Sequence, residues 1–356
     1  MFAGDNGQGK TNLLEAIYAV CTLRSFRTRR LAELIAFDRT EARLAAQVER
    51  GGSVRTYELG LTPTGRQVRL DGKAVRPAAR YFGGFQVVLF APEDLTVARG
   101  APADRRAFLD RAVFQRAPEY LAEAQDYDKV LRSRNAVLRA ASGRGHAGAG
   151  SARDSAGLLA VYDERLAELG ARRVYRRAQL VAEMTPRLRA AFSAITRADL
   201  AAEARYASPW LASGARLDDE ADLRAQLAAA LLAARSVDLA RAVTTVGPHR
   251  DDVELSLGGR AAASFASQGQ LRAYVLAWKI AELELLAETH GDAPILLLDD
   301  VSSELDPQRN EYLFDFLRTK KPQCFVTTTH RRHVLAGEQR IDFDVSSGVL
   351  TRQNAE

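Results

Sequence analysis

The chain has 356 residues, 47% hydrophobic and 27% charged, which is enough for one large or two ordinary domains with packed cores. Its longest apolar run, Leu227 to Ala234, is far too short to cross a bilayer, and the first residues do not form a secretory signal, so we expect no membrane partner. The only cysteines, Cys21 and Cys324, exclude a disulfide framework and favour a reducing cytoplasm, while the net charge of +5 permits a polyanionic partner.

The first motif in chain order is a phosphate-binding loop of the form GxxxxGKT. Its glycines let the main chain approach a nucleotide's phosphates closely, with backbone N–H groups pointing at them. Lys10 is expected to meet the β- and γ-phosphates and Thr11 to hold Mg²⁺. The residues predicted to bind nucleotide here are Gly4, Asp5, Asn6, Gly7, Gln8, Gly9, Lys10 and Thr11.

The residues that follow this loop support the prediction, but those that precede it do not. Leu13, Leu14, Ile17 and Val20 have helical spacing, so the loop runs into a helix whose positive end faces the phosphates. A phosphate loop should also follow a buried strand, yet only residues 1 to 3 precede it. We therefore expect the N-terminal strand to be missing, which would leave neighbouring strand edges unpaired.

Strand patterns follow in the next part of the chain. The segments around 42 to 49, 54 to 61 and 66 to 76 alternate apolar and polar residues, and Asp71-Gly72 marks a turn in the last, so they predict a small antiparallel meander. Residues 85 to 90 are a continuous apolar run typical of a strand buried on both faces.

The middle of the chain, from about Asp104 to Leu239, is almost free of strand signals. Two heptad-like stripes predict an antiparallel helical hairpin inserted into an α/β domain, with a mobile glycine-rich loop at 142 to 157 between them. The stripes consist of Tyr120, Ala124, Tyr127, Leu131 and Leu138, and of Leu158, Tyr162, Leu166 and Leu169. The predicted domains are residues 1–100, a helical insert at 101–240, and residues 241–356.

A long apolar helix is expected to begin at Ser267-Gln268-Gly269-Gln270. Ser267 and Gln270 have the spacing of a capping box, which is a sufficient structural explanation. The same helix N-terminus, with Gly269 allowing close approach, can also bind a γ-phosphate held by another subunit. Both interpretations can hold at once.

A buried strand is predicted at 295 to 299, and the motif from 294 to 300 is an apolar strand ending in two carboxylates, the Walker B form. Adjacent residues on a strand point to opposite faces, so both carboxylates can be used only if the chain turns there. Asp299 is expected to coordinate Mg²⁺ and Asp300 to orient or deprotonate the attacking water. Alone, the pattern is equally consistent with a buried strand that has a polar exit. A second buried strand is predicted at 324 to 328.

The order GxxxxGKT, SQGQ, LLLDD, SSELD is similar to that of the ATP-binding-cassette (ABC) ATPases. The closest resemblance, covering nearly the whole chain, is to the RecF family of bacterial recombinational repair proteins. It is carried by GDNGQGKTNLLEAIY (4 to 18), residues 89 to 113, VLRSRNAVL (130 to 138), VGPHRDDVEL (246 to 255), residues 266 to 286, ILLLDDVSSELDPQRN (295 to 310) and FVTTTH (325 to 330). SMC-type relatives share the ATPase motifs but carry far longer coiled coils.

The resemblance implies an α/β ABC-type ATPase head with a mixed sheet and an inserted helical lobe. It implies an ATP- and Mg²⁺-dependent homodimer in which two nucleotides are sandwiched between Lys10-bearing loops and Ser267-bearing helices of opposite subunits. Ser303 and Asp306 match the segment that crosses the subunit interface. The family clamps DNA at single-strand gaps during replication restart and the SOS response, and works with mediator proteins to load recombinase, with slow, DNA-stimulated hydrolysis.

Some site residues are less defined by the pattern. Asp300 stands where many cassette ATPases use Glu, and His330 occupies the place of their γ-phosphate sensor, although a surface histidine at a strand end is equally consistent. Gln86 and Glu93 are both candidates for coupling nucleotide to the helical lobe. The DNA contacts predicted from basic clusters are Arg24, Arg27, Arg29, Arg30, Arg105, Arg106, Arg132 and Arg134; Arg139 and the cluster Arg172, Arg173, Arg176 and Arg177 are further candidates, and solvated helix faces are the alternative.

Three other functions remain open from the sequence. One is a non-hydrolytic scaffold or DNA-binding module with a degenerate ATP site. A second is a short SMC-like ATPase. A third is a transporter-type nucleotide-binding subunit, which the helical insert and the segment at 246 to 252 disfavour.

Overall fold

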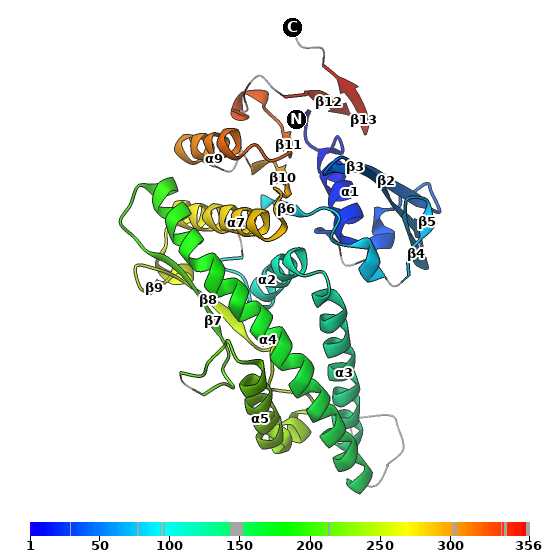
Figure 1. Cartoon of the computed structure of the whole chain (residues 1–356), viewed down its shortest axis with the longest axis vertical. Helices are drawn as coiled ribbons and strands as arrows, with labels where there is room; N and C mark the ends of the chain where they lie inside the picture. The colour runs from blue at the N-terminus through cyan, green and yellow to red at the C-terminus, as the bar shows by residue number, and fades with distance from the viewer. Residues whose placement is uncertain are drawn as a thin grey trace. The chain divides into compact units, whose positions relative to one another are not determined.

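The computed structural model describes residues 1–28, 30–76, 78–92, 94, 97–142, 152–212, 214–301, 305–335, 337 and 340–353. The chain forms two compact units (Figure 1). The first comprises Met1–Thr96, Arg187–Leu200 and Ala266–Glu356, and the second comprises Val97–Pro186 and Ala201–Phe265. The second unit therefore extends past residue 240, the end predicted from the sequence.

A mixed six-stranded sheet lies at the centre of the first unit, in the order β13-β12-β1-β11-β10-β6. Neighbouring strands are parallel except the hairpin of β12 and β13. The predicted buried strands are confirmed, two of them at the predicted bounds, because continuous apolar runs suit a sheet covered on both faces. The strands are β1 (Phe2–Ala3), β6 (Val87–Phe90), β10 (Ile295–Asp299), β11 (Cys324–Thr328), β12 (Phe343–Ser346) and β13 (Val349–Arg352).

The strand before the phosphate loop, which the sequence leads us to expect to be missing, is present as the two residues of β1. The two residues of β1 lie between β11 and β12, and Phe2 is in register with Thr327 on one side and Phe343 on the other. The Phe2 ring stacks on Phe325, with centroids 6.2 Å apart, and packs against Phe343 at 5.6 Å. Two residues thus pair with both neighbouring strands and bury an aromatic anchor beneath the loop.

An antiparallel sheet in the order β2-β3-β4-β5 confirms the predicted meander. Its inward residues, including Leu44, Leu59 and Val68, pack in the core around the first helix. Asp71 and Gly72 both have positive φ, as a two-residue hairpin turn requires. The strands are β2 (Ala42–Arg50), β3 (Ser53–Thr62), β4 (Gly65–Leu70) and β5 (Lys73–Ala74).

Two helices of the first unit, α7 and α9, begin at residues whose side chains accept hydrogen bonds from N–H groups of the first turn. Ser267 caps α7 and Gly291 ends it in the left-handed conformation, and Asp306 caps α9, which starts with Pro307. The helices are α1 (Lys10–Thr22), α7 (Gln268–His290) and α9 (Pro307–Lys320), with the 3-10 turns η1 (Leu31–Leu34), η2 (Ala78–Tyr81) and η4 (Arg331–His333).

The second unit is mainly helical. Its elements are α2 (Pro102–Arg116), α3 (Tyr120–Ala141), α4 (Ala152–Thr196, whose last residues belong to the first unit), β7 (Ala202–Ala207), α5 (Glu220–Arg241), β8 (Asp252–Leu257), β9 (Arg260–Ala261) and α6 (Ala262–Phe265). Two ion pairs give the relative direction of α3 and α4. Arg134 of α3 pairs with Asp163 of α4, whereas Asp128, earlier in α3, pairs with Arg173, later in α4. The two helices are therefore antiparallel, as the stripes predicted.

Two details of this unit differ from the sequence-based predictions. The segment expected to lack strands contains β7, which pairs with β8 in an antiparallel sheet. Leu158, the expected start of the second stripe, is 49% exposed, whereas its neighbour Leu159 is buried. The other leucines of this stripe, Leu166 and Leu169, are buried as predicted, so only its first position differs.

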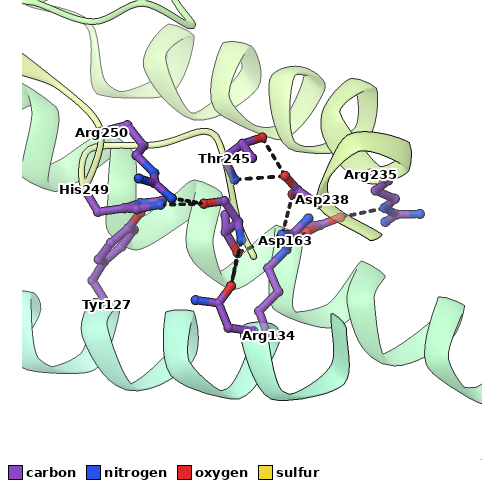
Figure 2. A network of polar contacts seen from close by, with 10 residues as sticks. Tyr127, Arg134, Asp163, Arg235, Asp238, Thr245, His249 and Arg250 are labelled. Carbon is purple, nitrogen blue, oxygen red and sulfur yellow. Dashed lines mark hydrogen bonds and ion pairs between the residues drawn. The ribbon is translucent and has the colours of Figure 1, made fainter. Parts of the chain in front are cut away.

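A buried polar network joins α3, α4 and α5 to the segment after α5 (Figure 2). Arg134 donates from Nε to Asp163 and from Nη1 to Asp238, both at 2.6 Å, and none of the three side chains is more than 8% exposed. His249 Nε2 donates to the Thr244 carbonyl, and Nδ1 accepts from the Tyr127 hydroxyl at 2.8 Å. Burial lowers the pKa of His249 to about 4, so this ring is neutral at pH 7.

Candidate nucleotide site

The phosphate loop leaves β1 and enters α1 through backbone conformations that suit glycine. Gly7 and Gly9 have φ of +78° and +100°. Gly4 is needed for another reason, since a Cβ there would clash with the backbone carbonyl oxygen of Val345. Gln8 ties the loop to the same β12–β13 hairpin, because its backbone carbonyl and side-chain oxygen accept from the N–H groups of Gly348 and Ser347. Contacts within the protein thus contribute to the shape of the loop.

Lys10 lies folded across this loop. Its ammonium donates to the backbone carbonyls of Gly4 at 2.6 Å and Asp5 at 2.8 Å, and the residue is only 7% exposed. A buried ammonium needs such partners. Phosphate oxygens could complete the same set of hydrogen bonds.

The Walker B carboxylate meets the loop directly. Thr11 Oγ1 donates to Asp299 Oδ1 at 3.0 Å, and Thr327 Oγ1 on the adjacent strand donates to the same oxygen at 2.7 Å. The Thr327 hydroxyl also accepts from the Asp300 N–H at 2.9 Å. Asp300 has φ +49°, so the chain turns between the two carboxylates, as their joint use requires.

These groups line a pocket of about 370 Å³, a volume within the usual range for small-molecule sites. Its lining residues are Asn6, Gly7, Gly9, Lys10, Thr11, Asn12, Arg27, Asp299, Asp300 and Thr327. The N-terminus of α1 opens onto it, which favours an anion. The hydroxyl of Thr11 and the carboxylate of Asp299 are hard oxygen ligands of the kind that Mg²⁺ takes, usually one or two per site alongside phosphates, so the residues present fit that ion.

The turn before α7 has the predicted capping box. Gln270 N–H donates to Ser267 Oγ at 3.2 Å, and Ser267 N–H donates back to Gln270 Oε1 at 2.8 Å. Gly269 lies against the guanidinium of Arg309, since a Cβ there would be 3.2 Å from one of its terminal nitrogens. Arg309 also forms an ion pair with Asp306. One arginine therefore links the Ser267 turn to the residue that caps α9.

Comparison with known proteins explains this combination of motifs. The RecF/RecN/SMC N terminal domain family matches residues 1–352. The chain is 44% identical to the DNA replication and repair protein RecF of Myxococcus xanthus (strain DK1622), over 99% of this chain and 91% of that protein. The chain belongs to the RecF family. The RecF of Anaeromyxobacter dehalogenans (strain 2CP-C) is 45% identical over 98% of this chain and 91% of its own length.

Solved structures agree with the RecF family assignment. A protein described as "recombination mediator protein RecF-ATPrS in RecFOR pathway" matches with a TM-score of 0.88 and 30% identity, over 99% of this chain and 91% of that one. Its RecF-ATP counterpart gives 0.85. An Smc head bound to a domain of ScpA has a TM-score of 0.52 at 14% identity, which shows a shared fold. The ABC- and SMC-type ATPase head predicted from the sequence is thus confirmed.

Several predicted site residues lie away from the pocket or outside the described residues. Ser303 and Glu93 are not among the described residues. His330 is exposed at the end of β11, with its ring 5.3 Å from that of His333, and is not among the residues lining the pocket. Gln86 is 5% exposed, and its amide contacts the Gly83 carbonyl. The structure therefore offers no contact between His330 or Gln86 and the nucleotide pocket.

The structure separates the predicted DNA contacts. Arg24, Arg30 and Arg132 are exposed, and Arg29 lies outside the described residues. Arg27 instead lines the nucleotide pocket, where Nη1 donates to Asn12 Oδ1 at 3.0 Å and to Glu15 Oε2 at 3.3 Å.

Other arginines in the predicted DNA set are committed to internal partners. Arg134 is fully buried, so the prediction that it contacts DNA is wrong. Arg105 is paired with Asp252 at 2.7 Å and only 14% exposed, and Arg106 donates to the Asp251 carbonyl. Both are poorly placed to meet a phosphate backbone.

The arginines on α4 that were further candidates for DNA contact also pair with carboxylates of the protein. Arg173 and Arg177 are buried and ion-paired with Asp110. Although burial acts to raise it, these two guanidinium groups hold the pKa of Asp110 well below its usual range. Arg172 pairs with Glu220 and Arg176 with Glu123, whereas Arg139 on α3 is exposed.

Sequence reasoning missed Thr327 and Arg309, and assigned Arg27 to another role. Thr327 could have been found from the sequence. The two buried apolar runs form neighbouring parallel strands, whose carboxyl ends lie side by side, and Asp299 is in register with Thr327. The contacts of Arg27 and Arg309 depend on side-chain directions that no spacing reveals.

Among the described residues, no helix combines the length and apolar character needed to cross a membrane. That part of the chain also has no group of three or more His, Cys, Asp or Glu side chains placed to hold a metal.

Proposed function

We propose that this chain is a slow, DNA-stimulated ATPase that clamps on DNA as an ATP-sandwiched dimer in recombinational repair and replication restart. The observation that carries the proposal is the 3.0 Å hydrogen bond from Thr11 to Asp299, which joins the phosphate loop to the Walker B strand within one pocket. The relatives named RecF, and the neighbours described with ATP and ATPrS, support the choice of ATP as ligand.

The residues of the pocket would have separate roles in binding phosphate, holding the metal ion and activating water. The loop N–H groups and Lys10 would bind the phosphates, with Lys10 exchanging its two carbonyl partners for phosphate oxygens. Thr11 and Asp299 would hold Mg²⁺, which polarises the phosphoryl oxygens when bound. Asp300 would orient or deprotonate the attacking water, and Thr327 holds both carboxylate-bearing residues in place.

Closure of the dimer would use surface that the monomer leaves exposed. Ser267 and Gln268 are exposed at the N-terminus of α7, and Gly269 and Gln270 follow in its first turn. This end of the helix would meet the γ-phosphate held by the partner protomer, together with Ser303 and Asp306. A γ-phosphate that stabilises only the closed dimer makes ATP a reversible clamp. The clamp would act in the cytoplasm with mediator proteins and recombinase at single-strand gaps.

Sedimentation of the purified chain with ATP and a gapped duplex tests the proposal. Asp300→Asn should retain ATP and accumulate as a dimer, since it keeps the site but slows hydrolysis. Lys10→Ala should lose ATP binding and stay monomeric. An Asp300→Asn protein that binds ATP yet remains monomeric at saturation would refute the sandwich, and a wild-type chain that binds no ATP would favour a scaffold instead.

Mixing two variants tests whether the pocket is shared. Lys10→Ala damages the phosphate loop, and Ser267→Arg damages the helix end that would reach across the interface. In an equal mixture, heterodimers should contain one intact pocket, restoring roughly a quarter of wild-type sites. A mixture as inactive as either variant alone would exclude a composite pocket.

A further inference from the structure

The outward face of the β2–β5 sheet carries a second large depression, of about 790 Å³. We call it the arginine hollow, after the four arginines that line it: Arg39, Arg43, Arg66 and Arg69. It is separate from the nucleotide pocket, since the lining residues of the two do not overlap. It is not accounted for by the nucleotide chemistry described above.

The register of the sheet explains how the hollow forms. Arg43 on β2 pairs with Gly60 on β3, and Gly60 pairs with Gln67 on β4. The neighbouring row, Leu44–Leu59–Val68, belongs to the core, so the row through Gly60 points outward. Two larger side chains thus flank a position with no side chain.

Internal packing does not require glycine at this position. Gly60 does not have positive φ, and a Cβ there would come no closer than 3.8 Å to any other atom, which is ordinary contact. Glycine in a strand interior costs about 0.5–1 kcal/mol relative to alanine and often marks the close approach of a ligand. Gly60 keeps the floor of the hollow clear at a cost in stability.

The charge in the hollow favours an anion. Its four arginines face two carboxylates, those of Glu41 and Glu58. Arg43 forms an ion pair with Glu58, yet its side chain remains 73% exposed, and that of Arg39 is 72% exposed. Arg66, opposite Leu61 in the inward row, lines the hollow but donates to the Leu23 carbonyl, so Arg39, Arg43 and Arg69 supply its outward positive charge. Exposed guanidinium groups can reorient toward phosphate at little cost.

We propose that the arginine hollow binds the phosphate backbone of duplex DNA. The proposal rests on the function proposed above and assigns its DNA to a surface. Single-strand sites combine positive charge with aromatic side chains on which bases stack, but the described residues lining the hollow include no aromatic one. An open basic depression without stacking groups suits a double-stranded backbone, which needs only charge and shape.

The test measures the anisotropy of a labelled 30-base-pair duplex bound to the full chain with a slowly hydrolysed ATP analogue, across a range of salt. Arg43→Gln and Arg69→Gln should each weaken binding about fivefold, and the double variant should reduce the salt slope by about two. Gly60→Gln should weaken binding with no change in ATP affinity. Glu41→Gln should strengthen binding, a gain that damage to the fold cannot produce.

Arg55→Gln is the matched control, because Arg55 lies on β3 in the alternate row, faces the other way, and is an exposed arginine paired with a carboxylate, Asp71. It should bind DNA like wild type. The inference is overturned if Arg43→Gln and Arg69→Gln keep wild-type affinity and slope, or if Arg55→Gln loses as much as they do. It is also overturned if losses occur only with single-stranded DNA. Failure of the wild type to bind any DNA would instead refute the proposed function itself.

Discussion

Replacing Arg134 by Met should destabilise the second unit severely, although this residue is far in sequence from both the phosphate loop and the Walker B strand. Arg134 lies between two carboxylates in the network of Figure 2, with no exposed surface. Methionine keeps much of the volume and removes the charge. The side chains left behind decide how large the effect is.

The loss of Arg134 leaves Asp163 and Asp238 with different remaining partners. Asp163 keeps an ion pair with Arg235 at 2.7 Å. Asp238 keeps only the hydrogen bonds from Thr245 to its other oxygen, so its charge loses its ionic partner in a fully buried position. Removing one partner of a buried pair costs about 3–5 kcal/mol. Because Asp163 is still compensated, we expect about 3 kcal/mol, or roughly 6–12 °C in the melting temperature of a unit of this size.

Scanning calorimetry is the appropriate assay, since a chain with two units need not unfold in one step. ATP binding should be unchanged, because the nucleotide pocket belongs to the first unit. Adding Asp238→Asn to Arg134→Met should recover part of the loss by removing the orphaned charge. A melting temperature of Arg134→Met within about 2 °C of wild type, or a double variant no more stable than Arg134→Met alone, would refute the reasoning.

Two further predictions concern a glycine and a histidine. Gly4→Ala forces a Cβ onto the Val345 carbonyl and should cost about 1–3 kcal/mol and weaken ATP binding; Gly157→Ala, on an open helix face, should be neutral or stabilising, and equal urea midpoints for the two would contradict the argument. The pKa of His249 is about 4 in the folded chain and 6.5 for an unperturbed histidine, so the unfolded chain binds its proton first and stability should fall by about 3 kcal/mol as pH drops from 6.5 to 4. The His249→Gln protein should show a flatter pH profile of unfolding free energy, and an equally steep one would exclude His249 as the cause.

The parts of the fold that could be predicted from the sequence are those set by local pattern. The strands β10 and β11 are continuous apolar runs with polar exits, so their bounds were predictable. The capping box before α7 is also local, since its hydrogen bonds span three residues. The phosphate loop was predictable for the same reason, because glycine spacing fixes its backbone.

The parts that could not be predicted depend on distant partners. A two-residue strand such as β1 has no periodicity, and only the edges of β11 and β12 define it. Arg134 resembles a solvated helix arginine until Asp163 and Asp238, 29 and 104 residues away, are placed beside it. The strand β7 buries mostly alanines, which give a weak apolar signal.

The left-handed backbone of Asp300 has a consequence for which acid can serve there. Short polar side chains such as Asp and Asn tolerate positive φ better than longer ones, because they bond locally to the main chain. Many cassette ATPases carry Glu at this place, but in this turn a longer side chain would both strain the backbone and extend its carboxyl group past the position that the Thr327 hydroxyl sets through the Asp300 N–H. The turn thus favours the shorter acid, and lengthening it by one methylene would change the conformation as well as the chemistry of this position.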